Sequence, residues 1–238
     1  NTDVYDPDTN IIVVTNHFQS NTFLQDPLNV ENMRNETSVY RYERMKELLA
    51  AHPQVTPGIA ADILSNYKGM EGKDIGLGNE KAVNQFIAHH SVIFEPEKLR
   101  IWVAGPPYQL GEYWSVDPYS LRNSALTPRN SAKLTGLSYT EVHGGRTEFH
   151  EGEKIPADSF LFDHEFQNLL KYRILAAKIE SGKYNEGDAD SLIKYNPEYF
   201  HTYRILGDYF RAKGEEQRAK EFYRVALEKE APSAVVSR

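Results

Sequence analysis

The chain has 238 residues, 40% hydrophobic and 26% charged, which is enough to bury the core of one large domain or two smaller ones. Its net charge of -7 and pI near 5.7 exclude the basic surface that sequence-independent nucleic-acid binding requires. The sequence contains no cysteine and no run of about 18 apolar residues, which excludes disulfides, thiolate chemistry and a membrane span within it.

The first predicted elements are a strand and a helix. Residues 11–15 are a β-branched run that follows a turn-forming segment, and this predicts a buried strand. Residues 19–36 are polar and contain Pro27, which favours an exposed loop. Apolar residues then recur every three or four positions, which predicts an amphipathic helix over residues 38–51.

A second helix is predicted to begin at Thr56-Pro57. Threonine is a good N-cap, and proline is favoured at the first helical position because its missing N–H would have no partner there. The apolar face of this helix carries Ile59, Ile63 and Tyr67.

A hairpin is predicted next. Residues 86–94 and 99–104 are rich in apolar and aromatic side chains, and a short Glu-Pro-Glu-Lys connection separates them. Residues 111–116 are a candidate third strand. Residues 118–155 carry mixed turn signals, which indicates a long excursion or linker with one hairpin at most.

The sequence from Phe160 onwards predicts four helices. Gly182 ends the first, the second covers about 187–195 before Asn196-Pro197 stops it, and the last two meet at Lys213-Gly214. We therefore divide the chain into a domain at 1–155 and a helical region at 156–238.

The last two helices resemble a tetratricopeptide repeat. The pattern of aromatic and small residues is carried by Tyr203, Leu206, Gly207, Phe210, Ala219, Tyr223 and Ala226. Gly207 and Ala219 are expected to let the two helices approach closely, and Pro232 is expected to end the second. A generic helical hairpin is the plainer alternative. Two repeats are too few for a free-standing solenoid, so they would pack on the neighbouring domain or bind a protein partner.

Three stretches of the N-terminal half resemble the acyl-coenzyme A:6-aminopenicillanic acid acyltransferase family. Val14-Thr15-Asn16-His17 is similar to its T-N-H motif at the end of a strand. Residues 38–49 are similar to its next helix, S-x-x-R-x-x-R-M-x-x-L-L. Ser91-Val92-Ile93-Phe94-Glu95, with the following strand up to Gly105-x-Pro107, is similar to its closing hairpin. The resemblance covers residues 11–116.

This resemblance implies an α+β fold, here a portion of an αββα N-terminal-nucleophile hydrolase sandwich followed by the all-helical region. Members of the family cut their own chain to free an N-terminal cysteine, whose α-amino group acts as its base. The resemblance thus implies an amide-bond hydrolase or acyltransferase acting on small N-acyl amide or peptide-like substrates without a cofactor. A complementary chain or N-terminal segment would supply the cysteine, so this chain alone is expected to be inactive.

The same resemblance makes Asn16 the donor that binds the oxyanion during catalysis, since a neutral amide NH₂ donates at any pH. His17 is a candidate substrate-binding residue. Asn84 and Gln85 are further candidates for binding substrate, because some family members have an arginine near the active site at the position of Gln85. This chain lacks that arginine, so the charge of the preferred substrate is left open. Arg41 and Arg44 are expected near the site, where they either form structural ion pairs or contact substrate.

No metal site is predicted. His89 and His90 are neighbours on a predicted strand and would point to opposite faces. His143, Glu148, His150 and Glu151 have metal-ligand side chains, but their spacing matches no helical zinc motif. The alternative to an enzyme is a non-catalytic interaction or scaffold protein that binds partners through its helical repeat. We expect the protein to be soluble. The sequence does not decide in which compartment it lies.

Overall fold

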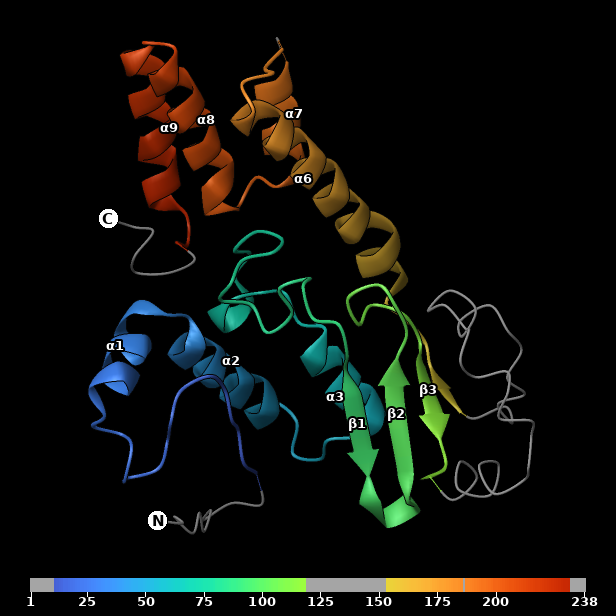
Figure 1. Cartoon of the computed structure of the whole chain (residues 1–238). Coiled ribbons are helices and arrows are strands. Elements are labelled where there is room, and N and C mark those ends of the chain that lie inside the picture. Colours follow the sequence, from blue (N-terminus) through green and yellow to red (C-terminus); the bar gives the residue numbers. More distant parts are fainter. Residues whose placement is uncertain (1–10, 119–152, 186, 232–238) are drawn as a thin grey trace, which may run out of the picture.

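The computed structural model describes residues 11–118, 153–185 and 187–231, and within them the chain combines helices with a small antiparallel sheet. The α+β class predicted from the sequence is therefore confirmed. The helices between residues 27 and 64 and the sheet form the N-terminal half, and the helices between residues 166 and 228 form the C-terminal half (Figure 1). None of the helices in the described part is both long and apolar enough to cross a membrane.

Helices α2 (Ser38–Ala50) and α3 (Pro57–Leu64) lie where the sequence predicted them. The Thr56 hydroxyl caps α3 by accepting a hydrogen bond from the Ile59 amide at 3.3 Å. Tyr67 of the predicted apolar face lies beyond the end of α3, although it still packs against the core.

Helix α1 (Pro27–Asn35) contradicts the loop predicted for residues 19–36. Its first turn is capped by the Asp26 carboxylate, which accepts hydrogen bonds from the amides of Leu28 and Asn29. Pro27, which favoured a loop in the sequence, occupies the first helical position instead.

The strand predicted for residues 11–15 is also wrong. This run pairs with no described strand, and Val13 is its only buried residue. Just beyond it, the Phe18 amide donates to Asn29 Oδ1 at 2.8 Å, and Asn29 Nδ2 donates to the Phe18 carbonyl at 3.1 Å. The buried Asn29 side chain thus anchors the segment that follows residues 11–15 to α1 and satisfies both backbone groups of Phe18.

The sheet contains strands β1 (Val92–Glu95), β2 (Arg100–Ala104), β3 (Tyr113–Val116) and β4 (Lys154–Ile155), antiparallel and in that order. The predicted hairpin and third strand are confirmed, but the first strand is shorter than the predicted 86–94. Phe86 has a φ of 54° and is fully buried, and this left-handed backbone is incompatible with a strand.

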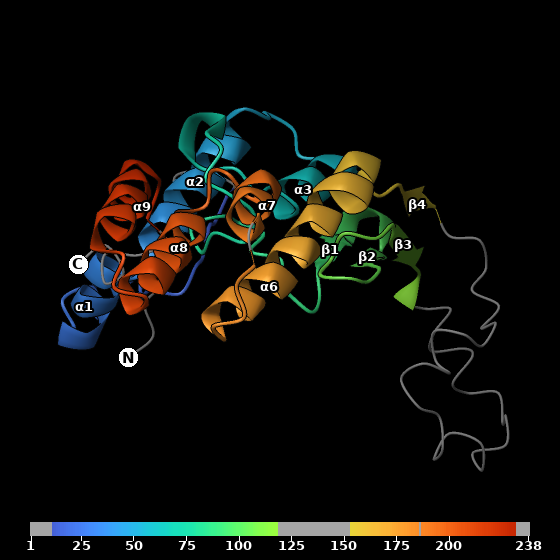
Figure 2. The same ribbon diagram turned by 90° about the horizontal axis from the view of Figure 1, so that it is seen from above.

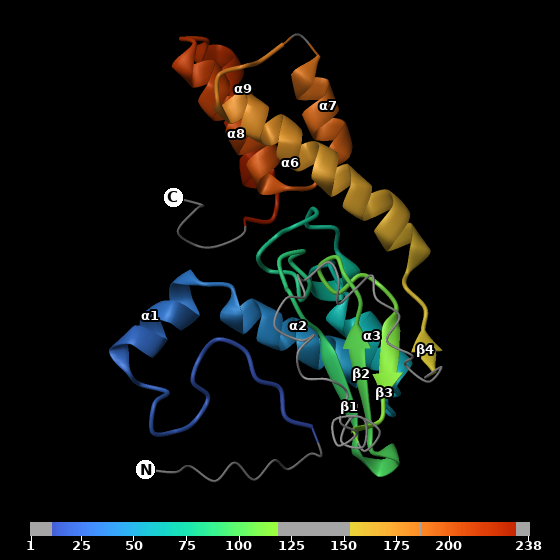
Figure 3. The ribbon, with the colours of Figure 1, turned by 45° about the vertical axis from the view of Figure 1, so that its right-hand side comes forward.

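The two faces of the sheet have different surroundings. Trp102 and Tyr113 are buried on one face, where they pack with Ala61 of α3. The opposite face has the cross-strand row Val92, Val103 and Trp114. These three side chains and Phe94 are exposed, Phe94 by 68% and Trp114 by 42%. Figure 3 shows β1 to β3 with α3 behind them. Within the described residues, helices therefore cover only one face of the sheet.

The C-terminal half follows the predicted helix order. A π-helical turn, η4 (Leu161–Glu165), precedes α6 (Phe166–Glu180), α7 (Asp188–Tyr195), α8 (Phe200–Ala212) and α9 (Glu216–Glu228). Helix α8 contacts α9, α6 and α7, and lies between α9 and α6 in Figure 2. A Cβ on Gly207 would lie 2.6 Å from Cδ1 of the Tyr223 ring and closer still to Cε1, which confirms the predicted close approach. Helix α9 ends at Glu228, and Pro232 lies outside the described residues.

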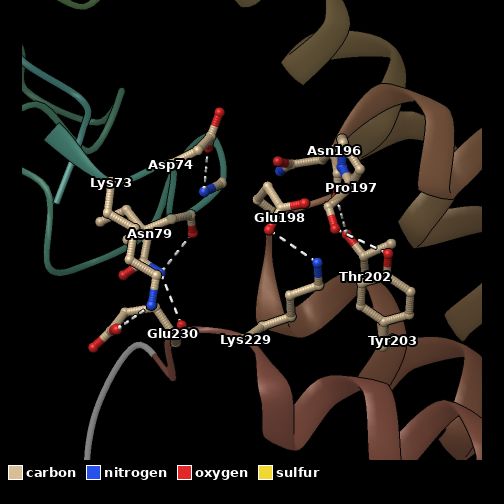
Figure 4. Close-up of polar contacts among 12 residues, drawn as sticks. Lys73, Asp74, Asn79, Asn196, Pro197, Glu198, Thr202, Tyr203, Lys229 and Glu230 are labelled. Carbon is tan, nitrogen blue, oxygen red and sulfur yellow. Dashed lines mark hydrogen bonds and ion pairs between the residues drawn. The ribbon is translucent and has the colours of Figure 1, made fainter.

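The loop at residues 73–86 joins the two halves. Leu77 donates its amide to Asn196 Oδ1 and accepts from Asn196 Nδ2, both at 2.9 Å. Glu230 forms ion pairs with Lys73 at 3.2 Å and with Lys81 at 2.6 Å. Figure 4 shows how Lys73 and Asn79 face Glu230 across this junction. One hydrophobic core continues from this loop into the helices, across the predicted boundary between residues 155 and 156. Its buried members include Leu77, Phe86, Leu110, Phe166, Leu169 and Leu206.

His201 on α8 makes the stability of this half depend on pH. Burial, and then the charge of Arg204, lower the pKa of His201 to about 4. An unfolded histidine titrates near 6.5, so the unfolded chain binds more protons between these two values. We expect the free energy of unfolding to fall by up to about 3 kcal/mol as the pH drops through this window.

Urea unfolding at several pH values between 7 and 4 measures this effect. His201→Asn should remove most of the dependence, because asparagine does not titrate. The raised pKa of Glu80, whose Oε1 lies 4.0 Å from His201 Nε2, gives an opposing dependence. Glu80 is present in both proteins, so the difference between the two curves reports mainly on His201. Parallel curves would contradict the assignment.

Candidate functional site

A pocket of about 260 Å³ lies between the segment that contains Asn16, helix α2 and the loop that contains Val83. Its lining combines apolar side chains with an amide, a hydroxyl and a guanidinium. The lining residues are Val14, Thr15, Asn16, Arg41, Met45 and Val83.

The segment around Asn16 is fixed by hydrogen bonds to the first turn of α2. Thr15 Oγ1 donates to the Ser38 carbonyl at 3.1 Å, and Ser38 Oγ lies 2.9 Å from His17 Nδ1. The ring of His17 also packs edge-on against Tyr42, with 5.6 Å between the ring centroids. Both neighbours of Asn16 are thus tied to one helix, and this holds the asparagine beside the next turn of that helix.

Arg41 orients the amide of Asn16. Its Nη2 donates to Asn16 Oδ1 at 2.7 Å, and its Nε donates to Thr37 Oγ1 at 3.4 Å. A guanidinium has only donors, so the asparagine must turn its oxygen toward Arg41. No hydrogen bond from Asn16 Nδ2 to another described residue is present, which leaves this NH₂ group available to a ligand at the pocket.

The described residues give the pocket a positive charge, carried by Arg41. No carboxylate of the described residues lies within 4.0 Å of the Arg41 guanidinium, and burial lowers the pKa of Arg41. Burial, and then the charge of Arg41, also lower the pKa of His17, so the imidazole is neutral at neutral pH. The site therefore provides a neutral amide donor next to a cation.

His17 and Ser38 do not form a nucleophilic pair at this pocket. Ser38 is 1% exposed, its hydroxyl is also bonded to Thr15, and neither residue lines the pocket. A serine nucleophile must be accessible to the carbonyl that it attacks. These two side chains hold the segment around Asn16 in place.

The second arginine of the predicted helix motif is in different surroundings. Arg44 is 5% exposed, pairs with Glu47 at 2.9 Å and donates to Asn66 Oδ1 at 3.3 Å. It links α2 to the segment after α3. The two arginines, three residues apart in the sequence, therefore have different environments, and only Arg41 lines the pocket.

Asn84 and Gln85 lie next to Val83 but not among the pocket-lining residues. The Asn84 side chain is fully buried, and its Oδ1 accepts from the Phe86 amide at 2.9 Å. Gln85 Nε2 donates to the Glu80 carbonyl at 2.8 Å. Both amides shape the loop that presents Val83 to the pocket.

The sequence did not single out Thr15, Ser38 or Val83 for roles at the pocket. Thr15 and Ser38 belong to the motifs that carried the family resemblance, which was the one available signal for them. No sequence signal pointed to Val83, because its position depends on contacts between its loop and the C-terminal helices.

No group of three or more potential metal ligands occurs in the described part of the chain. His89 and His90 lie before β1 rather than on a strand, and both are exposed. His143, Glu148, His150 and Glu151 lie outside the described residues.

Comparison with known proteins finds no matching family model, curated protein or solved structure.

Proposed function

We propose that this chain is the oxyanion-binding part of an amide-bond hydrolase or acyltransferase. A complementary chain or N-terminal segment supplies its cysteine nucleophile. The observation that carries the proposal is the geometry of Asn16, whose Oδ1 is held by Arg41 while its NH₂ is left to the pocket. The sequence resemblance to the acyl-coenzyme A:6-aminopenicillanic acid acyltransferase family supports the same role.

In the proposed reaction, the thiolate of the N-terminal cysteine attacks the carbonyl carbon of an acyl donor. The carbonyl oxygen becomes an oxyanion, and Asn16 Nδ2 donates a hydrogen bond to it. Asn16 Oδ1 accepts a hydrogen bond from Arg41. This bond polarises the amide and makes Nδ2 a stronger donor. The C–N bond of the tetrahedral intermediate then breaks, and the amine leaves with the proton that the α-amino group took from the thiol. The acyl group stays on the cysteine as a thioester until water or another amine takes it up.

The face of the sheet that no described helix covers supports a missing complementary layer. The row formed by Val92, Val103 and Trp114, together with Phe94, is exposed, and β1 is an edge strand of the described sheet. An apolar sheet face and a free edge are costly in water and mark a binding surface. We propose that the segment bearing the cysteine packs there and completes an αββα sandwich.

We further propose that the C-terminal helices are a tetratricopeptide-like region that supports the enzyme. The close contact of Gly207 with Tyr223 fits such a repeat, and Asn196 and Glu230 bind the loop that contains Val83. A protein partner on these helices is the alternative function, and the experiment below distinguishes the two.

Purification of the protein from its full-length gene tests the proposal. Intact mass and N-terminal sequencing of everything that copurifies should reveal a chain that begins with cysteine. Incubation with an activated acyl ester should add one acyl group to that cysteine. A preparation that contains no such chain and takes up no acyl group would support a scaffold protein instead.

A further inference from the structure

The charge of Arg41, which forms no ion pair with a described residue, bears on the substrate. Arg41 uses Nη2 for Asn16 and Nε for Thr37, and Nη1 makes no hydrogen bond with a described residue. The guanidinium lines the pocket together with the apolar side chains of Val14, Met45 and Val83. A cation that is partly removed from water without a counter-ion is a binding site for an anion.

We propose that Arg41 binds a carboxylate of the substrate and thereby selects N-acyl amino acids and peptide C-termini over neutral amides. This inference rests on the proposed function, because it assumes that the carbonyl to be cleaved lies at Asn16. A guanidinium suits the role, since its planar N–H groups match the geometry of a carboxylate.

The spacing of the two groups specifies which carboxylate fits. Asn16 and Arg41 are joined by one hydrogen bond of 2.7 Å, so their ligands must also be close together. In an N-acyl α-amino acid, the acyl carbon and the carboxyl carbon are separated by two atoms, or roughly 3–4 Å. One molecule can therefore present its carbonyl to Asn16 and its α-carboxylate to Arg41. A carboxylate several bonds further away would not reach both.

The charges around Arg41 favour this ligand over a structural counter-ion. His17, which neighbours Asn16, has a lowered pKa and is neutral at neutral pH. The two carboxylates of α2 are engaged elsewhere: Glu43 pairs with Lys46, and Glu47 pairs with Arg44 and accepts from the Glu71 amide. No acidic side chain of the described residues competes with a substrate for Arg41.

The test uses matched substrates on the full-length protein. N-phenylacetylglycine and N-phenylacetylglycinamide share the bond to be cleaved and differ in the negative charge. We expect the ratio of their kcat/KM values to favour the carboxylate by at least about 10-fold, and Arg41→Met to bring this ratio close to one. Because Arg41 also orients Asn16, both rates should fall in the variant, but that common loss cancels in the ratio.

Two further variants serve as controls. Arg34→Met removes an exposed arginine at the end of α1 and should leave the ratio unchanged. Arg41→Lys keeps the charge and should retain part of the preference. A parent ratio near one, or a ratio that Arg41→Met leaves unchanged, would overturn the inference while the proposed function stands.

A binding arm separates this inference from the proposed function. Equilibrium binding of N-phenylacetylglycine and its amide is measured on the full-length protein and on Arg41→Met. If neither compound is cleaved but the parent prefers the carboxylate and the variant does not, the selectivity stands and the proposed reaction fails. If neither compound is cleaved and binding shows no preference, both are wrong.

Discussion

Gly76→Ala is expected to lower the free energy of unfolding by about 3–4 kcal/mol, because it combines a backbone penalty with overpacking. Gly76 has a φ of 83°, and a Cβ there would lie 2.6 Å from the backbone nitrogen of Tyr199 and closer still to its Cα. Tyr199 directly precedes α8, so rotation of a side chain cannot relieve the contact. The loop and the helix would have to separate, which would disturb the hydrogen bonds between Leu77 and Asn196.

Gly72→Ala is the matched control. Gly72 has a φ of 72°, but a Cβ there meets nothing within 4 Å. Gly72→Ala should therefore lower the free energy of unfolding only by the backbone penalty of about 1–2 kcal/mol. Urea denaturation of the parent and both variants measures the difference. Equal losses for the two variants would contradict the close contact between the loop and α8.

The elements that the sequence predicted correctly are those specified by local signals. Thr56-Pro57 begins α3, the spacing of apolar residues gives α2, and Gly182 and Gly214 end helices with φ values of 79° and 80°. Such signals act within a few residues, so a single sequence shows them.

The errors fall where tertiary contacts replace local ones. Residues 11–15 have the composition of a strand, but the side chain of Asn29 provides the hydrogen bonds just beyond them. Residues 86–91 were predicted to extend β1, yet burial of Phe86 against Phe166 imposes a left-handed backbone there. These contacts join residues far apart in the chain, and composition does not encode them.

The candidate site was predictable only in part. The family resemblance named Asn16 and Arg41, which are 25 residues apart, but not the hydrogen bond between them. Nor did the sequence distinguish Arg41 from Arg44, since both fit the same helical motif. The ion pair of Arg44 with Glu47, and the absence of a described carboxylate near Arg41, appear only in three dimensions.

Asn16→Ala is the second substitution for which we expect a large effect. It should reduce kcat of the full-length enzyme about 10²–10³-fold, equivalent to about 3–4 kcal/mol of transition-state stabilisation. KM should change little, because the hydrogen bond from Nδ2 strengthens as the oxyanion forms. Stability should be nearly unchanged, because Asn16 is exposed and its hydrogen bond with Arg41 lies at the surface.

Asn16→Asp removes the hydrogen-bond donor without changing the volume of the side chain. The aspartate has the same shape, but its carboxylate cannot donate to an oxyanion and would pair with Arg41. We therefore expect a loss at least as large as for alanine. Asn21→Ala, an exposed asparagine outside the pocket, is the matched control and should retain full activity.

If Asn16 stabilises the oxyanion, its removal slows the formation of the acyl-enzyme. Rapid mixing of the full-length protein with an activated acyl ester, followed by intact mass measurement, gives this rate on the N-terminal cysteine. We expect the parent to acylate about 10²–10³ times faster than Asn16→Ala, with the final extent unchanged. Equal acylation rates for the two proteins would contradict this role of Asn16.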